Sequence, residues 1–128
     1  MNRRAFLFAS LAASAASTAR AASSPQVIYI GGKDCGPCQR WRSTYHERWL
    51  GSPEYRRVAW YEIEPPHLRE AYLVEHWPET LWSVLDQVPR RSGTPRFLIV
   101  RDERIVSNEI GVSKWLNTMA ELRRLLGE

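Results

Sequence analysis

Four short apolar runs, and the lengths of chain between them, constrain the fold more than any other feature of the sequence. They cover residues 27–30, 58–63, 97–100 and 105–106. Short, β-branched, apolar runs are typical of buried strands. A helix-length segment follows each of the first two runs, whereas only the polar turn 101–104 separates the last two. We therefore expect the first two strands to be parallel, with a right-handed crossover, and the last two to form a hairpin.

The intervening segments have the pattern of helices. Trp41, Tyr45 and Trp49 recur every four residues, which places one stripe of a helix on the core. Two helical pieces are expected between Pro65 and Val88, separated by Pro78, and a last helix begins near residue 113. The predicted fold class is α/β, in the order β-α-β-α-β-β-α. Its mixed four-stranded sheet has the strand order 2-1-3-4 and helices on both faces.

The first 21 residues have the three parts of an export signal. Residues 2–4 are positively charged, residues 6–16 are apolar and rich in Ala and Ser, and residues 19–21 match a small-x-small cleavage site. The arginine pair at positions 3 and 4 resembles the twin-arginine signal. We expect a signal peptide over 1–21, one mature domain over 22–128, and a periplasmic protein exported by the twin-arginine or general secretory route. An uncleaved N-terminal anchor is the alternative.

The basic balance of the chain is mostly a property of this leader. The leader holds three of the 18 Lys and Arg residues and none of the 14 acidic residues. The remaining chain therefore carries a formal charge of only +1. We expect no nucleic-acid partner.

Both cysteines of the chain lie in the stretch Cys35-Gly36-Pro37-Cys38, directly after the first strand. Pro37 falls in the first turn of the next helix, where a missing N–H is tolerated. The spacing alone permits a metal site, a structural disulfide or a redox pair. A disulfide that closes so short a loop constrains little of the unfolded chain. The histidines at positions 46, 67 and 76 have no fixed ligand spacing to the cysteines, so we expect no metal site.

This arrangement resembles the thioredoxin family. About sixty residues after the cysteines, Gly93-Thr94-Pro95 precedes an apolar strand, where that family carries its cis-proline. The resemblance covers roughly residues 26–127 and implies a thioredoxin-like fold with a helical insert around residues 65–90. More narrowly, the chain is similar to the small periplasmic thioredoxins associated with bacterial sulfur oxidation.

Three features depart from the family pattern. The first strand and helix of full-length thioredoxins are missing. Asp34 stands where the family usually has tryptophan, and Tyr29 stands where cytosolic thioredoxins have a buried aspartate. With Tyr29 there, the thiol of Cys38 would give its proton to water or to another group such as Glu62. Tyr29 itself is interpreted as a core residue.

The resemblance implies a thiol-disulfide oxidoreductase that reduces partner disulfides without a cofactor. Cys35 would be the nucleophile, stabilised as thiolate by the helix N-terminus and opposed by the neighbouring Asp34. Cys38 would be the resolving thiol. The expected partners are protein disulfides or dithiols, with a membrane protein as one source of electrons, and the expected state is a monomer. A copper or zinc carrier and a regulatory partner-binding module are the alternatives. The remaining site residues are the loop residues Gly36 and Pro37 and the substrate-binding residues Thr94 and Pro95, with Pro95 in the cis form.

Overall fold

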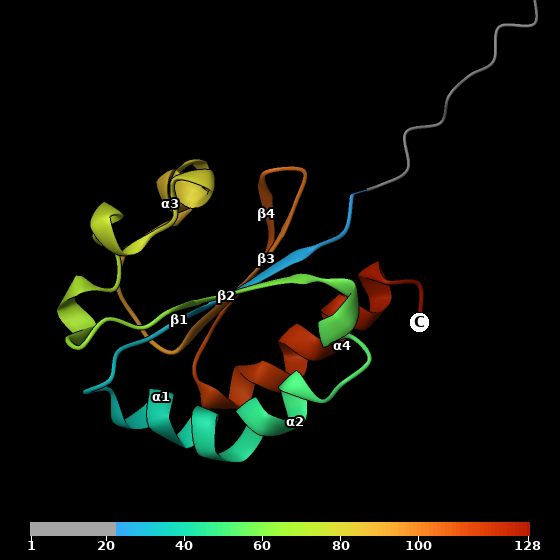
Figure 1. Cartoon of the computed structure of the whole chain (residues 1–128), viewed down its shortest axis with the longest axis horizontal. Helices are drawn as coiled ribbons and strands as arrows, with labels where there is room; N and C mark the ends of the chain where they lie inside the picture. The colour runs from blue at the N-terminus through green and yellow to red at the C-terminus, as the bar shows by residue number, and fades with distance from the viewer. Residues whose placement is uncertain (1–22) are drawn as a thin grey trace, which may run out of the picture.

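A computed structural model describes residues 23–128, and a mixed four-stranded sheet lies at their centre (Figure 1). The expected leader lies outside the described residues. The strand order is β2-β1-β3-β4. β1 and β2 are parallel, and the other two pairs are antiparallel. This confirms the topology predicted from the sequence. The strands are β1 (Gln26–Ile30), β2 (Ala59–Ile63), β3 (Arg96–Arg101) and β4 (Arg104–Ile110).

One face of the sheet is covered by the helices that follow β1 and β4 (Figure 1). The first of them runs through α1 (Gly36–Trp41), a π-helical segment (Arg42–His46) and α2 (Glu47–Leu50). The expected core stripe is confirmed, because Trp41 and Trp49 are buried and Tyr45 is partly buried. Trp41 and Trp49 pack on Trp115 at the start of α4. The other elements of this side are α4 (Trp115–Leu125) and the 3-10 turns Tyr55–Arg57 and Val112–Lys114.

The opposite face is covered by the segment between β2 and β3, which we call the insert (residues 64–92). It contains α3 (Trp82–Gln87) and three single-turn 3-10 helices, η3 (Leu68–Glu70), η4 (Val74–His76) and η5 (Glu79–Leu81). The predicted helical piece after Pro65 is therefore wrong in form. Leu73 has an extended backbone between two turns. The Trp77 indole donates to the Ala71 carbonyl at 2.9 Å and takes the acceptor that a continuous helix would use.

Both faces of the sheet are buried, which explains why its central strands contain the continuous apolar runs 27–30 and 97–100. Alternate residues of β1 point to opposite faces, and all four residues from Val27 to Ile30 are fully buried. Burying an aliphatic side chain contributes about 1.5–3 kcal/mol. β1 and β3 thus form a rigid support, and the loops at their ends are held in place.

A buried arginine organises the loop before β3. Arg96 is 1% exposed, and its guanidinium lies 5.3 Å from the centre of the Tyr72 ring. Its two Nη atoms donate to the carbonyl oxygens of Pro89, Arg90 and Ser92, at 3.2, 2.8 and 2.7 Å respectively. Arg96 therefore anchors the end of the insert next to the Thr94–Pro95 bond, a role that the sequence analysis did not assign.

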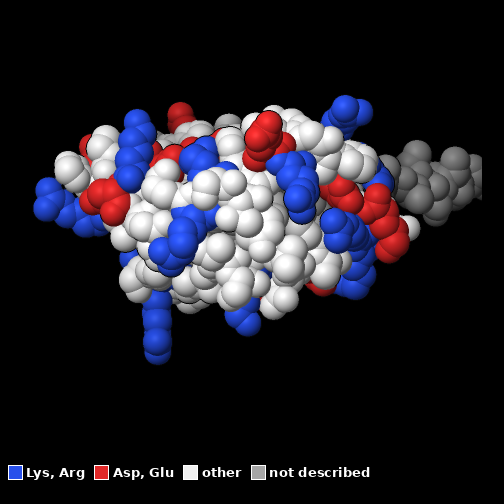
Figure 2. All heavy atoms as spheres, turned by 90° about the horizontal axis from the view of Figure 1, so that it is seen from below, with Lys and Arg blue, Asp and Glu red and all other residues white. Residues whose placement is uncertain are grey.

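The charged side chains are dispersed on the face of the molecule formed by α1, α2 and α4, which we call the helical face. Figure 2 shows Lys and Arg side chains protruding separately from this face, with acidic side chains among them. Within residues 23–128, no helix is long and apolar enough to span a membrane.

Candidate active site

The two cysteines form a disulfide at the N-terminus of α1. Cys35 is the N-cap residue, and its Sγ accepts a hydrogen bond from the backbone N–H of Cys38 at 3.2 Å. The two sulfurs differ in access, because Cys35 is 4% exposed whereas Cys38 is completely buried. A helix N-terminus carries unpaired N–H groups and a partial positive charge, which stabilise a thiolate. The geometry therefore favours the outer cysteine, Cys35, as the attacking group.

The loop before the cysteines depends on two glycines. A Cβ atom on Gly31 would lie 2.4 Å from the Tyr29 hydroxyl and 2.9 Å from Cys38 Sγ. A Cβ on Gly32 would lie 2.7 Å from the Cα of Leu68. All three distances are shorter than real Cβ contacts, so any larger residue would push the loop off Cys38 or off the insert. The sequence analysis used this glycine pair only to mark the end of a strand.

The Gly93-Thr94-Pro95 loop lies directly against the disulfide. The Thr94–Pro95 peptide bond is cis, as the resemblance implied. Thr94 Oγ1 lies 3.5 Å from Cys35 Sγ. The sheet pairing of this chain segment begins only at Arg96, so Thr94 stands outside the ladder and beside the reactive sulfur. Pro37 occupies the first turn of α1 as predicted, and Gly36 is exposed next to it.

Asp34, which stands where the resemblance led us to expect tryptophan, binds the insert. Its Oδ1 accepts a hydrogen bond from the backbone N–H of Leu68 at 2.7 Å. Its Oδ2 lies 3.7 Å from Nδ1 of His67. This carboxylate caps the short η3 turn from a distant part of the chain. The residue before the first cysteine thereby joins the cysteine loop to the insert, which nothing in the sequence pattern indicated.

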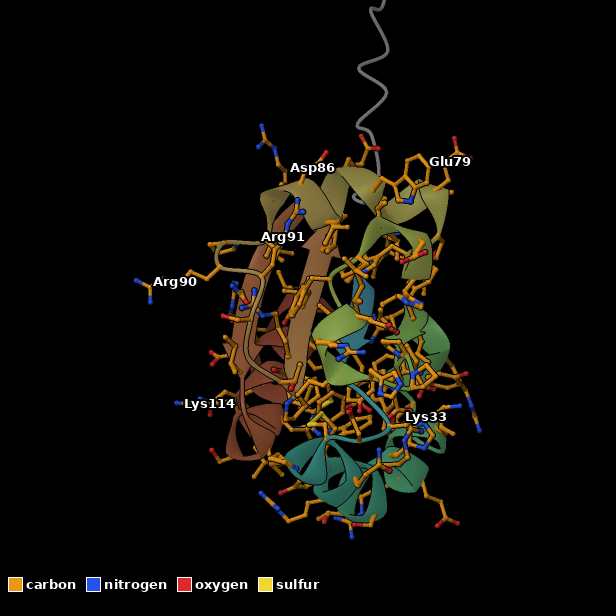
Figure 3. All side chains as sticks on the ribbon, turned by 90° about the vertical axis from the view of Figure 1, so that its left-hand side faces the viewer. Lys33, Glu79, Asp86, Arg90, Arg91 and Lys114 are labelled. Atoms are coloured by element: carbon orange, nitrogen blue, oxygen red, sulfur yellow. A yellow bond between two sulfur atoms is a disulfide. The ribbon has the colours of Figure 1, made fainter. Side chains whose placement is uncertain are left out.

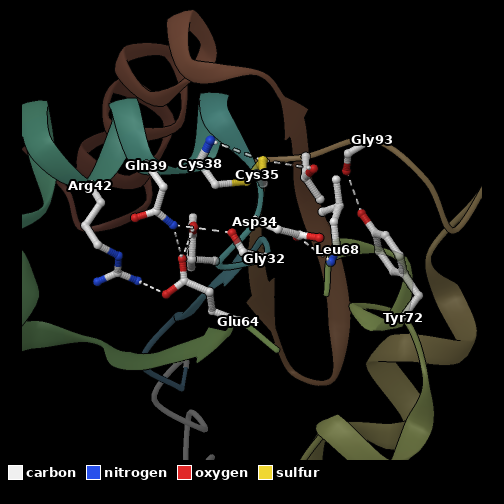
Figure 4. The surroundings of a disulfide bond; sticks show 12 residues. Gly32, Asp34, Cys35, Cys38, Gln39, Arg42, Glu64, Leu68, Tyr72 and Gly93 are labelled. Atoms are coloured by element: carbon white, nitrogen blue, oxygen red, sulfur yellow. Dashed lines mark hydrogen bonds and ion pairs between the residues drawn. A yellow bond between two sulfur atoms is a disulfide. The ribbon is translucent and has the colours of Figure 1, made fainter. Parts of the chain in front are cut away.

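Tyr29 is a core residue, as predicted, and its hydroxyl also belongs to a polar network. The ring stacks on Trp41 at 4.5 Å, and the hydroxyl donates to Glu64 Oε1 at 3.1 Å. Gln39 donates to the same oxygen at 3.0 Å, and Arg42 binds the other oxygen of Glu64 at 2.6 Å (Figure 4). Burial raises the pKa of Tyr29 far above its usual value, and the adjacent Glu64 raises it further. Tyr29 therefore keeps its proton at neutral pH.

Glu62, which the sequence analysis considered as a proton acceptor, faces a different set of partners. Arg42 donates to it at 2.6 Å, and the Trp60 indole donates to it at 3.1 Å. His46 lies 3.2 Å from it. Burial raises the pKa of Glu62, but these hydrogen bonds outweigh burial and leave the pKa below its usual value. The carboxylate bonded to Tyr29 is Glu64, not Glu62.

The histidines are dispersed over the molecule. His46 contacts Arg42 and Glu62, His67 lies near Asp34, and His76 lies 3.6 Å from Glu70. In the part of the chain that the structure describes, no three or more His, Cys, Asp or Glu side chains are grouped to hold a metal ion.

Comparison with known proteins shows the fold of this chain. No protein-family model and no curated protein matches the sequence. Among solved structures, the chain resembles a thioredoxin from Malassezia sympodialis, with a TM-score of 0.52 and 18% identity over 77% of this chain and 76% of that chain. It also resembles the periplasmic thioredoxin SoxS from Paracoccus pantotrophus, with a TM-score of 0.52 and 14% identity over 81% and 97% of the two chains. Thioredoxin f2 from Chlamydomonas reinhardtii gives a TM-score of 0.51 and 17% identity over 79% and 78%. The predicted thioredoxin-like fold is confirmed.

Proposed function

We propose that the protein is a periplasmic thiol-disulfide oxidoreductase that reduces the disulfides of partner proteins through a Cys35/Cys38 dithiol–disulfide cycle. The observation that carries this proposal is the Cys35–Cys38 disulfide at a helix N-terminus, beside a cis-proline loop and with Cys35 the more exposed of its two cysteines. A structural disulfide would not need this combination. The thioredoxin-like fold supports the same chemistry.

The reaction proceeds in two exchange steps. The thiolate of Cys35 attacks one sulfur of the partner's disulfide and forms a mixed disulfide with it. The partner's S–S bond breaks, and its other sulfur leaves as a thiolate that takes up a proton. The Cys38 thiol then loses its proton, and its sulfur attacks Cys35. This forms the Cys35–Cys38 disulfide and releases the reduced partner. Two electrons have moved to the partner, and a dithiol donor, such as an exported domain of a membrane protein, must return them.

The remaining site residues serve this exchange by positioning. Pro37 fixes the backbone of the first helical turn and removes one competing N–H. Gly36 is exposed and leaves the approach to Cys35 open. Thr94, outside the sheet ladder and 3.5 Å from the sulfur, offers its backbone to an extended partner segment. The cis form of Pro95 directs Thr94 toward the cysteines.

The export signal predicted from the sequence of residues 1–21 supports a periplasmic location, where disulfides persist. A similar structure, SoxS, is itself described as a periplasmic thioredoxin. We propose that residues 22–128 act there as a monomer on protein partners and not on nucleic acid. The dispersed charges of the helical face support the last point.

Insulin reduction by the mature protein, with dithiothreitol as electron donor, tests the activity. Cys35→Ser and Cys38→Ser should both abolish turnover. Cys38→Ser should in addition hold partners as mixed disulfides on Cys35, whereas Cys35→Ser should hold none. Absence of thiol-dependent turnover, together with tight binding of Cu(I) by the cysteine pair, would instead establish a metal carrier.

A further inference from the structure

We infer that the insert supplies a substrate-specificity pocket, which binds an apolar side chain flanked by a carboxylate in the partner segment that carries the attacked cysteine. The inference rests on the proposed function and specifies its substrates. The pocket lies between η3 and the loop before Pro95, and we call it the insert pocket. Its apolar walls are Leu68 and Tyr72, its charged rim is Arg69 and Arg91, and Thr94 forms the end nearest the disulfide.

The position of the insert pocket connects it to the reactive sulfur. Thr94 lines the pocket, and its Oγ1 lies 3.5 Å from Cys35 Sγ. A partner cysteine at Cys35 therefore places its neighbouring residues over Thr94 and into the pocket. In an extended segment, residues two apart project to the same side about 7 Å from each other. The volume of about 440 Å³ accepts a leucine-sized side chain there.

The walls are fixed by hydrogen bonds that the protein already makes. The Tyr72 hydroxyl donates to the carbonyl oxygen of Gly93 at 2.7 Å and so joins the two sides of the pocket (Figure 4). Leu68 is held by Asp34, and the Tyr72 ring lies against the Arg96 guanidinium. A pocket fixed in this way loses little conformational entropy when a partner binds.

The rim of the insert pocket is basic and available for pairing. Both charged lining residues are arginines. Arg69 is exposed and has no ion pair within residues 23–128. Arg91 faces only Asp86 at 3.5 Å, and the side chains of this pair are 49% and 80% exposed, so the pair is weak and easily exchanged. The loop that carries Arg91 lies on the side of the molecule that also presents the disulfide (Figure 3). A partner carboxylate therefore complements this rim.

Short peptide probes test the inference. Each probe is a seven-residue peptide with one cysteine, joined to a second copy of itself by a disulfide. On each side of the cysteine, one leucine and one glutamate occupy the two nearest positions. In matched probes, lysine replaces glutamate or serine replaces leucine. Single-turnover reduction by the dithiol protein should be about three- to tenfold faster for the glutamate probe than for the lysine probe. It should be about tenfold faster with leucine than with serine.

Charge reversal assigns the preference to the pocket. Arg69→Glu and Arg91→Glu should each remove or invert the preference for glutamate, whereas Arg56→Glu, an exposed arginine in the 3-10 turn Tyr55–Arg57, should leave it unchanged. Arg56→Glu should reduce 2-hydroxyethyl disulfide, which is small and uncharged, at the wild-type rate, and for every variant the peptide rates are compared after division by its rate with this disulfide. Equal reduction of all peptide probes by a wild-type protein that reduces this small disulfide would overturn the pocket and leave the oxidoreductase intact. Failure to reduce insulin and the small disulfide alike would overturn the proposed function itself.

Discussion

Replacing Asp34 by alanine tests whether this carboxylate couples the cysteine loop to the insert. Its Oδ1 accepts the Leu68 N–H at 2.7 Å, in the manner of a helix cap supplied by another segment. Such caps contribute about 0.5–2 kcal/mol, and the Asp34 side chain is 51% exposed. We therefore expect the lower part of that range, a loss of about 0.5–1 kcal/mol in the free energy of unfolding. The melting temperature of the oxidised protein should fall by about 2–8 °C.

Urea unfolding measures the global loss, and amide hydrogen exchange followed by NMR measures the local one. The Leu68 amide should exchange faster in Asp34→Ala, because its acceptor is gone. Asp34→Asn keeps an acceptor oxygen and should lose less than half as much stability. Lys33→Ala, at the exposed neighbouring position, is the matched control. Equal Leu68 exchange rates and equal stabilities in Asp34→Ala and Lys33→Ala would refute the coupling.

Three further substitutions test the polar contacts around the site. Tyr72→Phe removes the hydroxyl bonded to Gly93 and should cost about 1 kcal/mol in urea unfolding. Burial raises the pKa of Tyr72 from 10.0 to about 12. The contribution of Tyr72 to the free energy of unfolding is therefore complete below pH 10 and is lost as the pH rises toward 12. The free energy of unfolding of Tyr72→Phe should decline less steeply over this alkaline range. The lowered pKa of Glu62 contributes stability that is present above pH 4.5 and is lost as the pH falls through the pKa of Glu62 in the folded protein. Glu62→Gln should weaken this dependence on acid pH, as measured by urea unfolding at a series of pH values. Arg96→Met removes the three bonds to the loop carbonyls and should lower the urea-unfolding free energy by about 2–4 kcal/mol; an unchanged midpoint would contradict its anchoring role.

The sheet was predictable because its determinants are local in the sequence. β1 and β3 are apolar on both faces, and the lengths of the connections decide which strands are parallel. The helix stripe of Trp41 and Trp49 follows from simple periodicity. The insert was less predictable, because its backbone is extended at Leu73 and the Trp77 indole binds the Ala71 carbonyl six positions earlier. A side chain that takes a backbone acceptor in this way competes with the helix, and apolar periodicity does not detect it.

The reactive part of the site could also be read from sequence, whereas its supporting contacts could not. Cys35, Cys38 and Pro95 carry a recognisable spacing, and the structure brings them together. The bond from Asp34 to Leu68 spans 34 positions and that from Tyr29 to Glu64 spans 35, so no local pattern predicts either of them. Only the fold brings these side chains together.

The contacts that the sequence did not predict join two parts of the molecule to which we assign different functions, exchange chemistry and partner specificity. The disulfide, the first helix and α4 belong to the core on one face of the sheet. The insert belongs to the separate core on the other face. Near the disulfide, polar contacts join the two sides, among them Asp34 with Leu68 and Glu64 with Gln39. Substitutions at the exposed Arg69 and at Arg91 can change which partners bind without disturbing the packing around Cys38, whereas Leu68 packs against the core that contains Cys38. Specificity can vary in such a protein while the exchange chemistry stays the same.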